Sequence, residues 1–254
     1  MIRSLRLALV FLTRLPLPPI EGPLPPVGHA VPWFPVVGSI VGCAAGGVYV
    51  GCLELMNSAP AAAVSVTFAV LLTGAFHLDG LGDVADALAG GSTPERRLEI
   101  MKDSRLGTYG VAALVLALVL QVTSLASLGA AQGWAALVVA HSVGRSSALW
   151  VMLLASPARA EGLGVDYVRD LRSGPTWAGG LVGVVAAGLL FGPWGALAIA
   201  VAVVAAAVVS RMARRAVGGF TGDVLGTVEQ VVEVTTLVVA AALATRVSGF
   251  PWWA

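Results

Sequence analysis

The chain has 254 residues, of which 57% are hydrophobic and only 11% are charged, and its formal net charge is +1. A soluble domain carries about 25% charged residues, so this composition excludes an ordinary water-soluble fold and favours a protein that crosses a membrane. The sequence shows no basic face and no set of stacking aromatic residues, so nucleic acid is not an expected partner.

The N-terminal segment, residues 1–32, contains no complete span. Its first part, residues 1–14, is a short apolar stretch with arginines at both ends, and we expect it to lie at the membrane interface or to re-enter. No small-residue cleavage site follows it, so we expect it to be retained and not removed as a signal peptide. The prolines of residues 16–26 then predict a rigid connector.

Long apolar runs predict an all-α, polytopic integral membrane protein with about seven transmembrane helices, forming a single membrane-embedded domain over residues 1–254. The predicted spans are 33–55, 59–76, 109–131, 134–155, two arms within 177–210, and 229–247. Gly192-Pro193 interrupts the longest run, which we therefore expect to form a tight helical hairpin. Small residues in the first span, GSIVGCAAGGVYVG, predict close helix packing in lipid.

The distribution of basic residues predicts the orientation of these spans. With seven spans, one side of the membrane receives the polar segments 1–32, 77–108, 156–176 and 211–227. Nearly all arginines and the lysine lie in these segments, whereas the opposite side has only Arg246. The positive-inside rule therefore places the polar segments in the cytoplasm. We expect the active site on this cytoplasmic face, in the loops 77–108 and 211–227.

Three carboxylates directly follow the second span. Asp79, Asp83 and Asp86 have the spacing i, i+4 and i+7, which stacks them on one face of a helix. Like charges so close are destabilising unless a cation lies among them, and Mg²⁺ prefers oxygen ligands. The alternative is a solvated acidic face without a ligand. Because the acids follow a membrane span and no basic residue lies between them, we favour a metal site.

The chain between these acids and the third span carries groups suited to phosphate. Thr93 predicts the N-cap of a new helix, with a proline in the first helical position. Lys102 and Arg105 can bind phosphate oxygens. We therefore expect Lys102, Asp103 and Arg105 to take part in catalysis or substrate binding, and the arginines at 96–97 to anchor the chain at the membrane.

A second glycine-rich block, GGFTGDVLG at 218–226, precedes the last span. A flexible loop of this kind can supply a metal ligand or backbone N–H groups for phosphate, so we expect Asp223 to join the metal ligands. Glycines also let a ligand approach the backbone closely. The substrate-binding candidates among these small residues are Gly80, Gly90, Gly91, Thr221 and Gly222.

Ionisable residues within the spans are costly and are functional by default. Glu233 lies in the last span and Arg145 in the fourth, and the two could pair. His77 precedes the acids and is a candidate base or ligand, although a lone histidine is more often structural. We include His77 and Glu233 among the substrate-binding candidates, whereas the sequence assigns no role to His29 or His141.

The two acidic blocks resemble the signature of the cobalamin synthase family, the adenosylcobinamide-GDP ribazoletransferases. The matching blocks, in family order, are FLTRLPLP at 11–18, WFPVVGSIVG at 33–42, FHLDGLGDVADAL at 76–88, MKDSRLGTYG at 101–110, EGLG at 161–164 and GGFTGDVLG at 218–226. They cover nearly the whole chain. Gly82, Ala87 and Thr227 depart from the usual family residues, but none of these departures removes an acid.

The resemblance implies a late step of cobalamin (vitamin B12) biosynthesis, in the cytoplasmic (inner) membrane and with Mg²⁺. Adenosylcobinamide-GDP would react with α-ribazole or its 5′-phosphate, releasing GMP and forming adenosylcobalamin or its 5′-phosphate. With this chemistry we expect Asp79, Asp83, Asp86 and Asp223 to hold the metal, and one of the acids, or Asp103, to take the hydroxyl proton. Soluble enzymes of the same pathway are possible partners for the cytoplasmic loops.

Two other functions fit parts of the sequence. A CDP-alcohol-type phosphotransferase of lipid head groups also uses aspartates on membrane helices around divalent metals, but its pattern places an Ala-Arg pair after the first Asp-Gly. In this chain Asp83 and Asp86 lie too close to the first Asp-Gly, and no Ala-Arg pair separates them from it. An ion-coupled transporter would place its acids in mid-span, whereas these acids cluster at one membrane face.

Overall fold

The structure is a computed structural model that describes residues 1–159 and 161–253. This part of the chain is helical, with one isolated bridge between Pro157 and Phe220. The helices are α1 (Ile2–Leu12), α2 (Phe34–Leu53), α3 (Ser58–Thr73), α4 (Phe76–Gly90), α5 (Pro94–Ile100), α6 (Thr108–Ala126), α7 (Ala130–Leu154), α8 (Leu163–Arg169), α9 (Ser173–Phe191), α10 (Gly195–Val217) and α11 (Gly222–Arg246). The all-α architecture predicted from the sequence is therefore confirmed.

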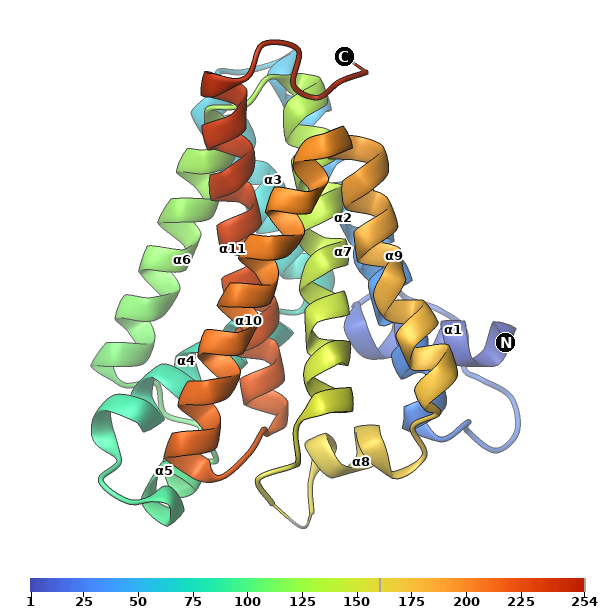
Figure 1. Ribbon diagram of the computed structural model, residues 1–254, viewed down its shortest axis with the longest axis vertical. Coiled ribbons are helices and arrows are strands. Elements are labelled where there is room, and N and C mark those ends of the chain that lie inside the picture. Colours follow the sequence, from blue (N-terminus) through green and yellow to red (C-terminus); the bar gives the residue numbers. More distant parts are fainter. Residues whose placement is uncertain (160, 254) are drawn as a thin grey trace.

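The bundle is that of a multi-pass membrane protein. Five stretches in the described residues are long and apolar enough to cross a membrane, or six if α3 and α4 together make one bent span. One of the five, Ser173–Val217, is a hairpin in which α9 and α10 run antiparallel (Figure 1). Its turn is the short 3-10 helix Gly192–Trp194, where the sequence predicted a break. If α3 and α4 make one bent span, and α9 and α10 are counted separately, these six stretches give seven crossings, the number expected from the sequence.

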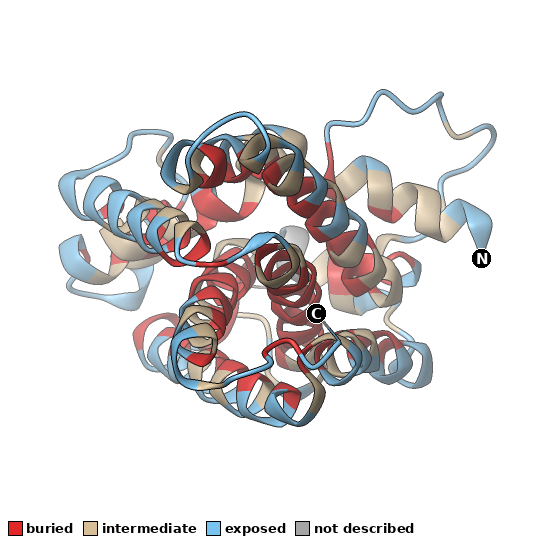
Figure 2. Cartoon of the chain, turned by 90° about the horizontal axis from the view of Figure 1, so that it is seen from above, coloured by how far each residue is buried: buried red, intermediate tan, exposed pale blue. Residues whose placement is uncertain are grey.

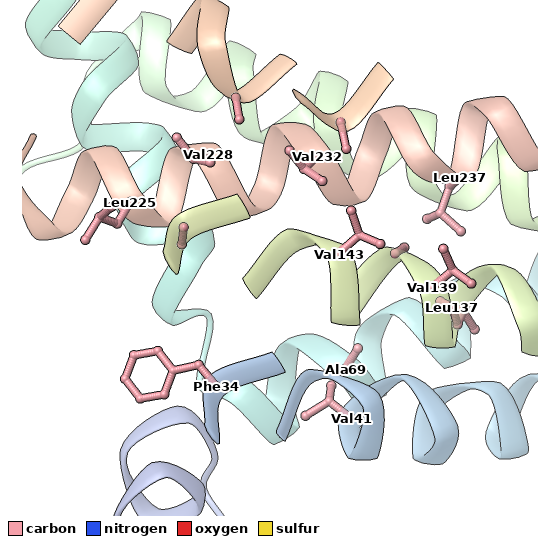
Figure 3. Packing of buried hydrophobic residues seen from close by; sticks show 14 of the residues in the cluster. Phe34, Val41, Ala69, Leu137, Val139, Val143, Leu225, Val228, Val232 and Leu237 are labelled. Atoms are coloured by element: carbon pink, nitrogen blue, oxygen red, sulfur yellow. The ribbon is translucent and has the colours of Figure 1, made fainter. Parts of the chain in front are cut away.

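Two helices, α7 and α11, form the centre of the bundle. Their apolar windows are 83% and 72% buried, against 28% for α6. Buried positions line the inner faces of the helices, and exposed positions lie on the outside (Figure 2). Val139 and Val143 of α7 lie between α11 and the pair α2 and α3 (Figure 3). Exposed aliphatic side chains such as Leu116 of α6 and Val204 of α10 lie on the outside of the bundle, as expected of a surface that faces lipid.

Helix α2 packs against α7 through a row of glycines. A Cβ atom added at Gly38 or Gly42 would lie 2.6 Å or less from backbone atoms of α7, and one added at Gly46 would lie 2.6 Å from the Trp134 ring. Small residues at this i, i+4 spacing let two helix backbones approach closely in lipid. The close packing predicted for this span is therefore confirmed.

The chain turns sharply between α3 and α4. The two helix axes differ by 90°, and Gly74 and Ala75 both have positive φ values, 64° and 58°. Left-handed backbone at a non-glycine residue is uncommon and is sustained by surrounding contacts. Here the Arg14 side chain lies against Gly74, and the Arg14 N–H donates to the Leu72 carbonyl at 2.7 Å. The N-terminal segment therefore supports the elbow that directs α4 across the end of the bundle.

The polar segments gather at one end of the molecule, as the sequence predicted. Helices α1, α4, α5 and α8 lie at this end, and the C-terminus lies at the other (Figure 1). An aromatic cluster joins α1 to the bundle, since Phe11 stacks on Phe34 at 5.8 Å and meets Phe76 and Tyr167 edge-on. We refer to this part of the molecule as the polar end.

The predicted loop 211–227 is much shorter in the structure. Helix α10 continues to Val217 and α11 begins at Gly222, so only residues 218–221 lie outside helices. The earlier start of α11 places Asp223 in its first turn, where the positive end of the helix dipole favours a carboxylate.

Replacing Gly42 with leucine should destabilise the protein, and replacing Gly47 should not. A side chain at Gly42 collides with the α7 backbone, whereas Gly47, on the same helix, has open space around its Cβ position. Overpacking of this kind costs about 1–3 kcal/mol. We expect Gly42→Leu to lower the thermal unfolding midpoint of the detergent-purified protein, with Gly47→Leu close to wild type. Equal midpoints for the two variants would contradict the α2–α7 packing.

Candidate active site

The crossing of α4 over the start of α11 creates the acidic site. A Cβ atom at Gly80 would lie 2.7 Å from the Asp223 carbonyl oxygen, and one at Gly226 would lie 3.3 Å from the Cα of His77. Thr227 strengthens the crossing, because its hydroxyl donates to the Gly80 carbonyl at 3.0 Å. Gly80, predicted to bind substrate, is thus placed in the helix contact, where it brings Asp223 beside the acids of α4.

Four carboxylates meet at this crossing. Asp79, Asp86 and Asp223 all lie near enough to Asp83 to repel its negative charge. Asp79 is exposed, whereas Asp83 and Asp223 are half-buried. Within the described residues, no three His, Cys, Asp or Glu side chains converge into a ready-made metal cage. The predicted residues are therefore neighbours, but their oxygens do not yet surround one point.

Asp86 has a structural partner that the sequence did not reveal. Its carboxylate accepts the backbone N–H of Gly107 at 2.6 Å and that of Gly110 at 2.8 Å. Gly107 is the N-cap residue of α6, so Asp86 satisfies N–H groups that have no partner within that helix. A Cβ atom at Gly107 or Gly110 would overlap the Asp86 carboxylate. Both positions therefore favour a residue without a side chain. Asp86 thus ties α4 to the start of α6.

The predicted phosphate-binding residues lie in the loop between α5 and α6. Met101, at one end of this loop, is buried and contacts the Thr221 hydroxyl at 4.0 Å. Gly107, at the other end, is bound by Asp86. The loop is therefore fixed to α11 on one side and to α4 on the other. Lys102 and Arg105 are exposed, at the same end of the bundle as the acids.

Asp103 and Arg105 form a two-bond ion pair at the surface. The Arg105 Nη2 donates to Asp103 Oδ2 at 2.6 Å, and its Nε donates to Oδ1 at 3.0 Å. These hydrogen bonds lower the pKa of Asp103 to about 2. A general base works best when its pKa lies near the working pH, so this pairing argues against Asp103 as the group that takes the hydroxyl proton.

A polar cavity of about 190 Å³ adjoins Asp223. Thr221 and Gly222 line it, together with Arg159 from the segment after α7. Arg159 lies close enough to attract the Asp223 carboxylate and donates to the Leu98 carbonyl at 2.7 Å. From the sequence, Arg159 is only one of several arginines in the polar segment 156–176. Its place at the site comes from the bridge between Pro157 and Phe220, which pairs two distant loops.

The other small residues that were predicted to bind substrate take part in helix capping and local packing. Thr221 is the N-cap of α11, accepting the Val224 N–H at 3.3 Å, and its hydroxyl donates to Asp223 at 3.2 Å. Gly91 lies against the Arg97 side chain, which reaches the Ala216 carbonyl at the end of α10. A Cβ atom at Gly90 would lie 3.5 Å from the Ile100 side chain, at ordinary van der Waals distance. The predicted N-cap Thr93 is confirmed, since its hydroxyl accepts the Arg96 N–H.

Glu233 and His77 belong to a buried ionic network in the interior of the bundle. Arg145 is 1% exposed and pairs with Glu233, as the sequence suggested, and it lies 3.5 Å from Glu229. His141 Nδ1 lies 2.8 Å from Glu233, and His77 Nε2 lies 3.0 Å from Glu229. The network therefore joins α7 and α11 to the first turn of α4.

His141 and Glu229 were missed at the sequence level. The sequence contains a signal for both residues. His141 precedes Arg145 by one helical turn, and Glu229 precedes Glu233 by the same interval. Each pair therefore shares a helix face. A cavity of about 30 Å³ lies beside the network, lined by His77, His141 and Glu233 among other residues.

Comparisons with known proteins agree with these motifs. The family model described as cobalamin-5-phosphate synthase matches residues 4–241. The adenosylcobinamide-GDP ribazoletransferase of Bradyrhizobium diazoefficiens is 39% identical over 250 residues, which cover 95% of this chain and 94% of the relative. The enzymes of the same name from Ralstonia nicotianae and Escherichia coli are also 39% identical, over 248 and 226 residues, covering 94% and 86% of this chain and 95% and 91% of theirs.

No solved structure shows a significant match to the chain. The family model nevertheless spans nearly every helix described above, including the two acidic blocks and the loop between α5 and α6. Together with the relatives, it shows that the chain belongs to the cobalamin-5-phosphate synthase family.

Proposed function

We propose that the chain catalyses the reaction for which its relatives are named, at the acidic crossing of α4 and α11. Adenosylcobinamide-GDP and α-ribazole, or its 5′-phosphate, are the substrates. The ribazole 3′-oxygen bonds to the corrinoid-linked phosphorus, the bond from that phosphorus to the bridging oxygen breaks, and GMP leaves with this oxygen. The observation that carries the proposal is the placement of Asp223 beside Asp79 and Asp83, at the same end as Lys102 and Arg105.

The acids fit Mg²⁺. All are hard oxygen donors, and the repulsion around Asp83 disfavours the cluster unless a cation joins it. Mg²⁺ usually binds through one or two carboxylates together with substrate phosphates and water, and it needs no complete protein cage. The absence of such a cage among the described residues is thus compatible with a metal that arrives with the diphosphate. When bound, the ion would neutralise charge on the transferring phosphate.

Asp79, Asp83 and Asp223 are the residues we propose as metal ligands. Asp86 was predicted as a fourth, but both its oxygens accept backbone N–H groups, so its proposed role is to hold α4 against α6. Asp83 is surrounded by the other acids and is our candidate for taking the 3′-hydroxyl proton, in place of Asp103.

Lys102 and Arg105 are proposed to bind the diphosphate. Transfer between phosphates requires positioning and charge neutralisation more than covalent chemistry, and a guanidinium group can bind phosphate through two hydrogen bonds. Arg105 pairs with Asp103 at 2.6 Å, and a diphosphate would compete with this carboxylate for the guanidinium group. Arg159 and the polar cavity beside Asp223 offer a second cationic position for the leaving GMP or for the ribazole phosphate.

The polar end is proposed to face the cytoplasm, within the cytoplasmic (inner) membrane. The basic residues gather at this end, as the positive-inside rule requires. Both substrates are large and polar, so an active site at the mouth of the bundle meets them without passage through lipid. The same surface is available for docking of soluble enzymes of the pathway.

The product assay tests the proposed reaction directly. Detergent-purified protein is given adenosylcobinamide-GDP and α-ribazole, with Mg²⁺ or with EDTA, and GMP and corrinoid products are measured by chromatography. We expect GMP and adenosylcobalamin in equal amounts, and neither in EDTA. A folded protein that releases no GMP but consumes a CDP-activated lipid would contradict the proposal and favour the alcohol phosphotransferase.

Changing Asp83 to asparagine should reduce kcat by at least about 100-fold, because proton transfer alone contributes about 10²–10⁴-fold in enzymes. Glu99→Gln is the matched control, since Glu99 lies at the same end but is 65% exposed and pairs only with Arg96. We expect this control to stay within twofold of wild type, because exposed ion pairs contribute about 0–1 kcal/mol. Comparable rates for the two variants would remove Asp83 from the mechanism.

Arg105→Ala should raise KM for adenosylcobinamide-GDP by about tenfold, the lower end of what a hydrogen bond to a charged group contributes. The control is Arg96→Ala, which removes a similarly exposed arginine that pairs with Glu99. Steady-state kinetics at saturating α-ribazole separate KM from kcat. If both variants change KM equally, the effect comes from overall charge at the polar end and not from a specific diphosphate contact.

A further inference from the structure

We propose that a phospholipid with an anionic head group binds in the wedge between α9 and α10. Its acyl chain would lie over α7, and its phosphate would meet Arg211 and Arg214. The wedge is a different part of the molecule from the acidic crossing, so lipid binding there can be measured without the proposed reaction.

The wedge arises from the shape of the hairpin. Helices α9 and α10 meet at the Gly192–Trp194 turn and spread apart toward the polar end, with α7 between them (Figure 1). The space between them is a cavity of about 740 Å³, lined mainly by apolar side chains that include Trp150 of α7, Val184 of α9 and Val203 of α10. This size lies within the range of sites that bind a ligand of several hundred daltons.

The positive charge of the wedge is confined to its polar end. Arg211 and Arg214 line the cavity in the last two turns of α10. Within the described residues neither makes an ion pair or a side-chain hydrogen bond that would neutralise it. Trp177, at the start of α9, lies on the opposite wall and is 46% exposed. Tryptophan and arginine at one level of a membrane helix are typical of the lipid head-group region.

Two hydroxyl groups in the wedge lack partners. The Oγ atoms of Ser147 and Ser210 are buried and form no hydrogen bond in the structure. Ser147 is fully buried, and both residues line the cavity. A buried polar group without a partner costs about 1–3 kcal/mol, so these hydroxyls favour an occupant that carries hydrogen-bonding groups, such as the ester oxygens of a glycerolipid.

The surroundings of the wedge favour a lipid over a soluble ligand. Two of the three helices that line the cavity, α9 and α10, belong to Ser173–Val217, a stretch apolar enough to lie in the membrane. Its walls continue into outward-facing aliphatic residues, since Leu181, Val185 and Val204 are each more than half exposed. In a bilayer these exposed aliphatic residues would face lipid chains, so an occupant could enter the wedge from the membrane. A soluble nucleotide would have to leave water for an apolar wall.

A lipid in this position would adjoin the active site. Gly218, Gly219 and Phe220 line the end of the wedge, and Phe220 also lines the polar cavity that contains Asp223. A bound head group would therefore restrain the short connection between α10 and α11.

Tryptophan quenching by brominated lipid tests the proposal. The protein in nanodiscs of unlabelled phosphatidylcholine receives increasing amounts of brominated phosphatidylglycerol or brominated phosphatidylcholine. We expect saturable quenching by phosphatidylglycerol at a low mole fraction, and only gradual quenching by phosphatidylcholine. Trp150→Phe should remove much of the saturable component, because Trp150 lines the wedge.

The double variant Arg211→Gln/Arg214→Gln should weaken this binding by about 30-fold, the expected effect of two arginines near an anionic lipid. Arg215→Gln is the control, because Arg215 lies in the same turn but does not line the cavity. Identical quenching by the two lipids, or unchanged affinity in the double variant, would overturn the proposal. Relief of quenching by α-ribazole 5′-phosphate would also overturn it, because the wedge would then be a nucleotide subsite.

Discussion

A full positive charge lies at the centre of the bundle, and the positions of α4, α7 and α11 follow from the way it is compensated. Arg145 is almost completely buried in α7, where an uncompensated charge is very costly. Its compensation requires Glu229 and Glu233 on α11 and brings His77 of α4 into the same network. Removing one partner from such a buried network costs about 3–5 kcal/mol. The network therefore fixes how α4, α7 and α11 lie against one another along their length.

This fixed arrangement brings the acids together. His77 lies only two residues before Asp79, so holding His77 against α11 also determines where α4 crosses that helix. The crossing at Gly80 and Gly226 then places Asp223 beside Asp79 and Asp83. Carboxylates so close repel one another, and the interior network contributes part of the stability that this repulsion removes. A bundle of this kind can keep an acidic site ready for a cation and a diphosphate.

Much of this structure could be predicted from the sequence, because membrane spans and acid clusters are local patterns. The hairpin turn at Gly192-Pro193 and the N-cap Thr93 follow from short stretches of chain. The gathering of polar segments at one end (Figure 1) follows from the number of spans between them. The pairing of Arg145 with Glu233 was also suggested, because each residue is unusual within its own span.

The rest depends on contacts between distant segments. Asp86 was predicted as a metal ligand, and the sequence did not show that its carboxylate accepts N–H groups at the N-terminus of α6, which begins 22 residues later. Gly80 was predicted to bind substrate, and the sequence did not show its close contact with α11. Arg159 reaches the site only through the pairing of Pro157 with Phe220. A single sequence does not show which small or charged residue will meet which partner across the bundle.

We propose that Asp83 and its neighbours form a divalent-metal site that is completed by the substrate diphosphate. Equilibrium binding of Mn²⁺, followed by electron paramagnetic resonance, measures this directly. We expect weak Mn²⁺ binding by the protein alone, much tighter binding when adenosylcobinamide-GDP is added, and loss of that tightening in Asp83→Asn. Mn²⁺ binding that is indifferent to the substrate, or unchanged in the variant, would contradict it.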